Sequence, residues 1–149
     1  GKANNVIPAS ATLELSVRAL DREVRAALER RIKALVAAQA ESFGVRAHID
    51  YRKGYAVLVN TPAETEFARR IGVELVGAGH VVANAPASTG SEDFAFMLEK
   101  RPGCYLFIGN GAGDEHGACM IHNPGYDFND ANLSIGAAYW ALLAESCLQ

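Results

Sequence analysis

The segment 12–18 alternates strictly between apolar and polar residues, and this period of two predicts a strand with one buried face. The segment 45–51 alternates in the same way and predicts a second strand. Between them, apolar residues recur every three or four positions from 24 to 43, which predicts a helix with Asp21 as its N-cap and Gly44 as its stop. This strand–helix–strand unit predicts half of a ferredoxin-like α/β sandwich.

The pattern changes after residue 54. The continuous apolar run 55–59 is typical of a segment buried on both sides. The residues 61–64 predict a capping box with proline at the first position of a helix that ends near Gly77. Further elements are predicted along the chain: a short strand at 81–82, a short helix after Ser91, a strand at 104–108 and a helix at 130–146. The fold class predicted is therefore α/β, with a boundary near Asn60 and Thr61.

Each predicted half is small for an independent domain. Two strands and one helix rarely bury enough surface to fold alone. The second half has about two short strands with three helices. Each half is therefore interpreted as part of a larger domain.

Composition excludes several classes of partner. The 149 residues are 50% hydrophobic and 21% charged, which is ordinary for a globular protein. A net charge of -3 argues against a nucleic-acid or anionic-membrane partner, and no apolar run approaches the ~20 residues that span a bilayer. No signal peptide is expected from the pattern of the first residues, and the three cysteines lack metal-type spacing. A cytoplasmic location with reduced thiols is expected.

The segment 121–130 carries the clearest chemical signal. His122 lies just before a Pro-Gly turn, where a neutral imidazole is well placed to bind a metal ion. The alternative is a turn histidine that hydrogen-bonds to backbone. One histidine does not hold a catalytic metal, and the sequence offers no convincing second ligand. The chain is therefore interpreted as part of a metalloenzyme with most of its metal site elsewhere.

Three motifs occur in order along the chain. The first is Asn5-Val6-Ile7-Pro8 with a following strand that ends at Arg18, the second is the run 90–95 that begins Gly-Ser-Glu-Asp-Phe, and the third is the segment 122–130. Together they resemble the C-terminal part of the dinuclear-metal amidohydrolases of the aminoacylase, hippurate hydrolase and indoleacetyl-amino-acid hydrolase family of metallopeptidases. Three ordered motifs are specific where one alone is not.

The resemblance implies a division of the chain. Residues 1–60 are expected to form the second half of a lid and dimerisation domain, and residues 61–149 the C-terminal segment of a metal-dependent catalytic domain. The family's other metal ligands, its glutamate general base and its lid histidine are expected upstream of Gly1. The chain by itself is therefore predicted to be catalytically inactive and to contain no catalytic residue.

The resemblance also assigns roles to individual residues. The intact enzyme is expected to bind two divalent metal ions (Zn, Mn, Co or Ni), and His122 is expected to be the last of their ligands along the chain. No bound metal ion is expected on the chain alone. Asn5 is expected to donate to the scissile carbonyl or its oxyanion, and Arg18 to clamp a substrate carboxylate bidentately. Gly90 and Glu92 are expected to line the site at a helix start. The simpler alternatives are an exposed arginine, a turn asparagine and an ordinary capped helix.

The activity implied is hydrolysis of the amide of an N-acyl or N-aroyl amino acid. Two metal ions would polarise the carbonyl and lower the pKa of a water, whose proton passes to an upstream glutamate. The expected partners are the N-acyl amino acid substrate and a second copy of the chain, because uncovered strand edges in the lid invite pairing. The alternative function is a small α/β binding or dimerisation module without catalysis.

Overall fold

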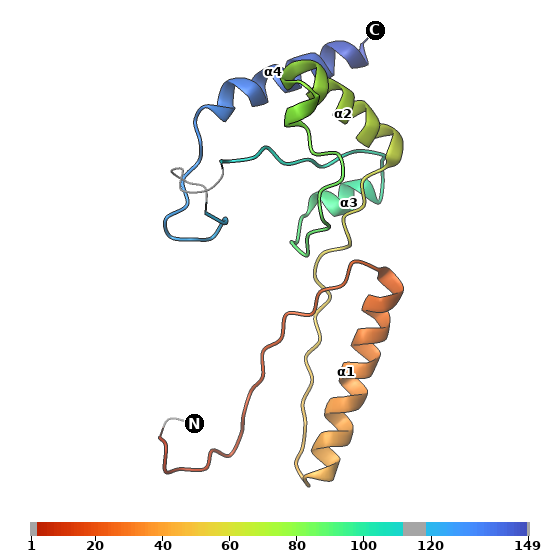
Figure 1. Cartoon of the computed structure of the whole chain (residues 1–149). Coiled ribbons are helices and arrows are strands. Elements are labelled where there is room, and N and C mark those ends of the chain that lie inside the picture. The colour runs from red at the N-terminus through yellow and green to blue at the C-terminus, as the bar shows by residue number, and fades with distance from the viewer. Residues whose placement is uncertain (1–2, 112–118, 149) are drawn as a thin grey trace. The chain divides into compact units, whose positions relative to one another are not determined.

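The computed structural model describes residues 3–111 and 119–148 (Figure 1). The chain divides into two compact units, of which the first contains residues up to 57 together with 87–90, and the second contains residues 58–86 and those from 91 onward. The described elements are helices: α1 (Arg22–Ser42), α2 (Pro62–Val76), the 3-10 turn η1 (Ala78–His80), α3 (Phe94–Leu98) and α4 (Asn132–Cys147).

The predicted α/β class with its ferredoxin-like lid is wrong. Within the two described ranges the secondary structure is helical, and the segments 12–18, 45–51, 55–59, 81–82 and 104–108 contain no β-strand (Figure 1). A period of two specifies which side chains share a face, but a strand also needs a neighbour that pairs with its backbone. These segments therefore carry the side-chain pattern of strands without the hydrogen-bonded ladder that defines one.

The helix predicted over 24–43 is confirmed as α1. The Asp21 carboxylate accepts a hydrogen bond from the Val24 amide at 2.8 Å, which caps the first turn. Glu23 adds a negative charge where the helix dipole favours one. After the helix the chain reverses at Gly44, whose φ of 64° is left-handed and suits glycine. Sequence and local structure therefore agree at both ends of this helix.

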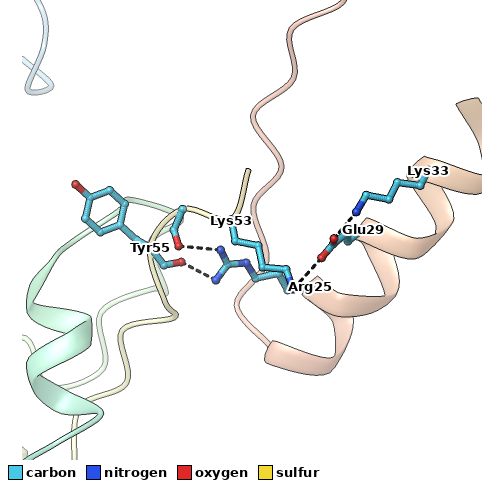
Figure 2. Close-up of polar contacts among 6 residues, drawn as sticks. Arg25, Glu29, Lys33, Lys53 and Tyr55 are labelled. Carbon is cyan, nitrogen blue, oxygen red and sulfur yellow. Dashed lines mark hydrogen bonds and ion pairs between the residues drawn. The ribbon is translucent and has the colours of Figure 1, made fainter. Parts of the chain in front are cut away.

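Polar side chains fasten the returning segment to α1 in the first unit. Arg25 donates to the carbonyl oxygens of Gly54 and Tyr55, at 3.1 and 2.6 Å (Figure 2). Glu29 pairs with Lys33 at 2.6 Å and with Lys53 at 3.3 Å, and the hydrogen bond from Lys33 lowers the pKa of the Glu29 carboxyl (Figure 2). Helix α1 contains no buried residue, so these polar contacts, and not a buried apolar core, join the returning segment to the helix.

The second unit contains the apolar core. The buried hydrophobic side chains among the described residues are Ala68 and Ile71 of α2, Ala95 of α3 and Tyr139 of α4. The Tyr139 hydroxyl donates to the Ala68 carbonyl at 3.1 Å, so α4 is joined to α2 by a buried hydrogen bond as well as by packing. Burial raises the pKa of Tyr139, because a phenolate is poorly solvated there.

Two side chains before α2 bind the backbone of residues 103–105. The Asn60 amide donates to the Tyr105 carbonyl and accepts from the Tyr105 N–H, both at 2.8 Å. The Thr61 hydroxyl accepts from the Gly103 N–H at 2.9 Å, and the Thr61 N–H donates to the Gly103 carbonyl at 3.0 Å. The predicted capping box is not formed, because the Thr61 hydroxyl contacts Gly103 and the Glu64 carboxylate and does not accept from the first turn of the helix.

Replacing Tyr139 with phenylalanine should lower the free energy of unfolding by about 1 kcal/mol, because the Ala68 carbonyl loses a buried donor. Tyr126→Phe is the matched control, since the Tyr126 hydroxyl has no partner among the described residues. Urea unfolding followed by Trp140 fluorescence measures both variants. Equal stability of Tyr139→Phe and the parent chain would show that this hydrogen bond contributes nothing net.

Candidate functional site

His122 occupies a strained position in a tight turn. The Asn123 N–H donates to the Met120 carbonyl at 3.1 Å, which closes a four-residue turn with Ile121 and His122 at its centre. His122 has a φ of 72°, and among the described residues it is the one non-glycine residue with a positive φ. His122 is the third residue of this turn. A turn in which only the third residue has a positive φ is of type II, and that residue is usually glycine or asparagine. The histidine is therefore held in a backbone conformation that its side chain disfavours.

A second turn follows directly. The Tyr126 N–H donates to the Asn123 carbonyl at 3.0 Å, and the Asn123 side chain accepts from the Gly125 N–H at 2.8 Å. Pro124 at the second position presets the backbone for this turn. The overlapping turns fix the chain on the C-terminal side of His122, and Asn123 is the residue they share.

The His122 side chain is exposed to solvent. Within residues 3–111 and 119–148, no hydrogen bond to its imidazole is found, and no group of three histidine, cysteine or acidic side chains is close enough to hold a metal ion. A backbone in the left-handed region costs of the order of 1–3 kcal/mol, and residues in such conformations cluster at functional sites. His122 is thus presented as a single potential ligand, and its role in metal binding stays a prediction.

Arg18 contacts the loop that contains Gly90 in the first unit. The Arg18 Nη1 donates to the Thr89 carbonyl at 2.6 Å, and its Nε donates to the Ser16 hydroxyl at 3.3 Å. The Gly90 N–H donates to the Ser88 hydroxyl at 3.2 Å, which folds the loop 87–90 tightly. A substrate carboxylate that bound Arg18 bidentately would compete with the Thr89 carbonyl for the same guanidinium.

The predicted site residues fall in different units. Asn5 belongs to the first unit with Arg18 and Gly90, and it lies in an exposed turn. Glu92 and His122 belong to the second unit. The contacts of the described residues bring Arg18 to the loop that contains Gly90, and they provide no comparable link between Glu92 and His122.

Tyr105 is a neighbour of Glu92 that sequence reasoning missed. Burial raises the pKa of Tyr105, and the negative charge of the nearby Glu92 carboxylate raises that pKa further. The rings of Phe94 and Phe107 flank the Tyr105 ring, with centroids 5.7 and 5.2 Å away. Nothing in the spacing of residues 92 and 105 signals this pairing, because it depends on how Asn60 holds residues 103–105.

The segment after the His122 turns is anchored by Asn110. The Asn110 amide donates to the Asp127 carbonyl at 2.7 Å and accepts from the Asn129 N–H at 2.8 Å. Asn132, at the start of α4, donates to the Gly109 carbonyl at 2.8 Å. Beside these bonds lies an open recess of about 480 Å³, lined by Ile108, Asn110, Tyr126, Phe128, Asn129, Asp130, Asn132, Leu133, Gly136 and Ala137.

Comparison with known proteins identifies the family. The chain belongs to Peptidase family M20/M25/M40, which matches it over residues 6–146. This confirms the resemblance inferred from the three motifs. The chain is similar to members that include a hippurate hydrolase and an amidohydrolase, so the predicted class of hydrolase is supported by the relatives' names.

Three relatives illustrate the similarity. The chain is 33% identical over 144 residues to the hippurate hydrolase of Campylobacter jejuni, covering 97% of the chain and 36% of that protein. It is 30% identical to thermostable carboxypeptidase 2 of Saccharolobus solfataricus, with the same coverage, and 27% identical to the N-acetylcysteine deacetylase of Bacillus subtilis, covering 100% of the chain and 37% of that protein. The chain therefore spans little more than a third of the length of these relatives.

No solved structure matches the chain. In the described part of the chain, no helix has both the length and the apolar character needed to cross a membrane.

Replacing Glu92 with glutamine should lower the pKa of Tyr105 toward its ordinary value, because a negative charge beside the phenol is removed. The pKa should stay above that value, since burial is the larger cause of the shift. Titration of ¹³Cζ-labelled tyrosine by NMR measures the change. Asp93→Asn should lower it less, and Tyr139, whose pKa Glu92 does not affect, serves as the internal reference.

The raised pKa of Tyr105 also determines the direction in which the stability of the folded chain changes with pH. A pKa raised in the folded state gives stabilisation that is fully present below the unfolded value of about 10, and it is lost as pH rises through the folded value. Alkaline unfolding of Glu92→Gln should therefore depend less steeply on pH than that of the parent chain. A Tyr105 pKa that Glu92→Gln leaves unchanged would contradict the pairing.

Proposed function

We propose that the polypeptide to which this chain contributes is a metal-dependent amidohydrolase that cleaves the amide of N-acyl or N-aroyl amino acids. The observation that carries this proposal is the family match over residues 6–146, combined with similarity to a hippurate hydrolase across 97% of the chain. Hippurate hydrolase and N-acetylcysteine deacetylase are both named for amides between an acyl group and an amino acid.

His122 is proposed to supply one metal ligand. A neutral imidazole is a good ligand for Zn²⁺ and related ions, and the His122 imidazole is exposed at a turn that restricts its backbone. Metal ions would polarise the scissile carbonyl and activate water. The described residues hold no group of three ligands. The remaining ligands are proposed to come from elsewhere in the intact protein. The chain alone is accordingly proposed to be inactive and free of tightly held metal.

Arg18 is proposed to bind the carboxylate of the amino-acid part of the substrate. Its guanidinium already donates to the Thr89 carbonyl, which holds it beside the loop of Gly90. A guanidinium group binds a carboxylate through two parallel hydrogen bonds, which together are stronger than one hydrogen bond to a carbonyl. A substrate carboxylate is therefore proposed to displace the Thr89 carbonyl. Asn5 and Glu92 are proposed as further contacts to the substrate, with residues 1–60 acting as the lid and residues 61–149 as part of the catalytic domain.

A homodimer formed through the lid remains part of the proposal. Leu13, Leu15 and Phe43 of the first unit are large hydrophobic side chains that the described structure leaves exposed. Large apolar side chains left in water are available for burial against a second copy of the chain.

The experiment that tests the proposal is a chimera in which this chain replaces the matched segment of the Campylobacter jejuni hippurate hydrolase. The chimera should release glycine from hippurate, and His122→Asn should reduce that rate by more than about 100-fold and lower the bound metal. Asparagine tolerates a positive φ, so the substitution removes the imidazole while the turn is kept. His48→Asn, at an exposed position of the first unit, is the control and should retain activity.

Two results would contradict the proposal. One is full hydrolysis and full metal content in the His122→Asn chimera. The other is tight binding of two divalent ions by the isolated chain in a calorimetric titration, because a single imidazole does not provide such affinity.

A further inference from the structure

The recess beside α4 has apolar walls and is open to solvent. Phe128 is 77% exposed and Leu133 is 72% exposed, and Ile108 and Tyr126 complete its apolar lining. Burying apolar surface contributes about 25 cal/mol per Å², so leaving several large apolar side chains together in water is unfavourable. Such a concentration marks a surface that another molecule covers.

Two side-chain amides at the rim of the recess are engaged with the backbone. Asn110 uses both ends of its amide on Asp127 and Asn129, and the Asn132 amide donates to the Gly109 carbonyl. Sites for small molecules orient their ligand through a few convergent polar groups. These amides already have partners within the protein, and the Asp130 carboxylate and the Tyr126 hydroxyl are among the other polar groups of the lining. The large apolar share of the lining favours polypeptide side chains over a small polar ligand.

Ile108 and Gly136 are neighbours at the floor of the recess. A Cβ atom added at Gly136 would lie 3.5 Å from the Ile108 Cδ1, which is an ordinary van der Waals distance, so α4 and the segment before residue 109 lie side by side there. The occupant therefore meets a preformed surface and does not need to separate α4 from that segment.

We propose that this recess receives large apolar side chains from the polypeptide by which the relatives exceed this chain. The chain spans 36% of the hippurate hydrolase and 37% of the N-acetylcysteine deacetylase, so most of each relative lies outside the matched region. The described residues bury four hydrophobic side chains, which is few for a chain of 149 residues. The inference rests on the proposed function, since the occupant is the remainder of the same hydrolase.

Leu133→Asp tests the recess directly. Leu133 lies in the first turn of α4, where an acidic residue favours the helix, so the isolated chain should lose no stability. In the hippurate hydrolase chimera the same carboxylate would be buried among apolar side chains, and the unfolding midpoint should fall by at least about 5 °C. Val82→Asp is the matched control, because Val82 is 80% exposed in the same unit and does not line the recess.

A second measurement keeps the test decisive if the Leu133→Asp chimera does not fold. The remaining part of the hippurate hydrolase, expressed separately, should bind the isolated parent chain and protect the amides of residues 126–137 from hydrogen exchange. The Leu133→Asp chain should bind it at least about tenfold more weakly, and the Val82→Asp chain should bind it normally.

Three outcomes would overturn the inference. The first is an equal effect of both substitutions on the chimera and on binding. The second is a parent chain that sediments as a dimer and a Leu133→Asp chain that sediments as a monomer, since the occupant would then be a second copy. The third is a recess that still binds an apolar dye in the chimera. A chimera with the expected midpoints but no hydrolysis would instead refute the proposed function alone.

Discussion

The second unit depends on side-chain amides that bind peptide groups far away in the sequence. Asn60 satisfies both the N–H and the carbonyl of Tyr105, as the backbone of a neighbouring strand would do. Asn110 does the same for the segment that contains Asp127 and Asn129. Because each amide holds its NH2 donor and its carbonyl acceptor side by side in one plane, two asparagines set the path of the chain before α2 and before α4. The buried contact between Tyr139 and Ala68 then joins those two helices.

The sequence indicated some of this organisation and not the rest. Helix α1 could be predicted because Asp21, the apolar spacing and Gly44 are local signals that need no distant partner. The expected strand at 104–108 failed for the opposite reason, because alternation or apolar character says nothing about which segment supplies the ladder. The pairing of Tyr105 with Glu92 also depends on residues distant in sequence and could not be read from spacing.

The candidate site was easier to predict as chemistry than as geometry. Three short motifs were enough to identify the family, since each contains residue types with restricted uses, and the match over residues 6–146 agrees. The motifs did not reveal that Arg18 donates to the Thr89 carbonyl or that His122 has a left-handed backbone. Those features arise from turns and loops, whose conformations follow from several weak preferences acting together.

At position 122 the backbone conformation favours glycine or asparagine, whereas the proposed role as a metal ligand needs histidine. At a φ of 72°, glycine or asparagine would satisfy the turn with less steric cost than an imidazole. Natural drift guided by stability alone would therefore move this position away from histidine. Under the proposed role of His122 as a metal ligand, keeping histidine there carries a standing thermodynamic penalty. A relative without that role is then expected to replace the histidine early.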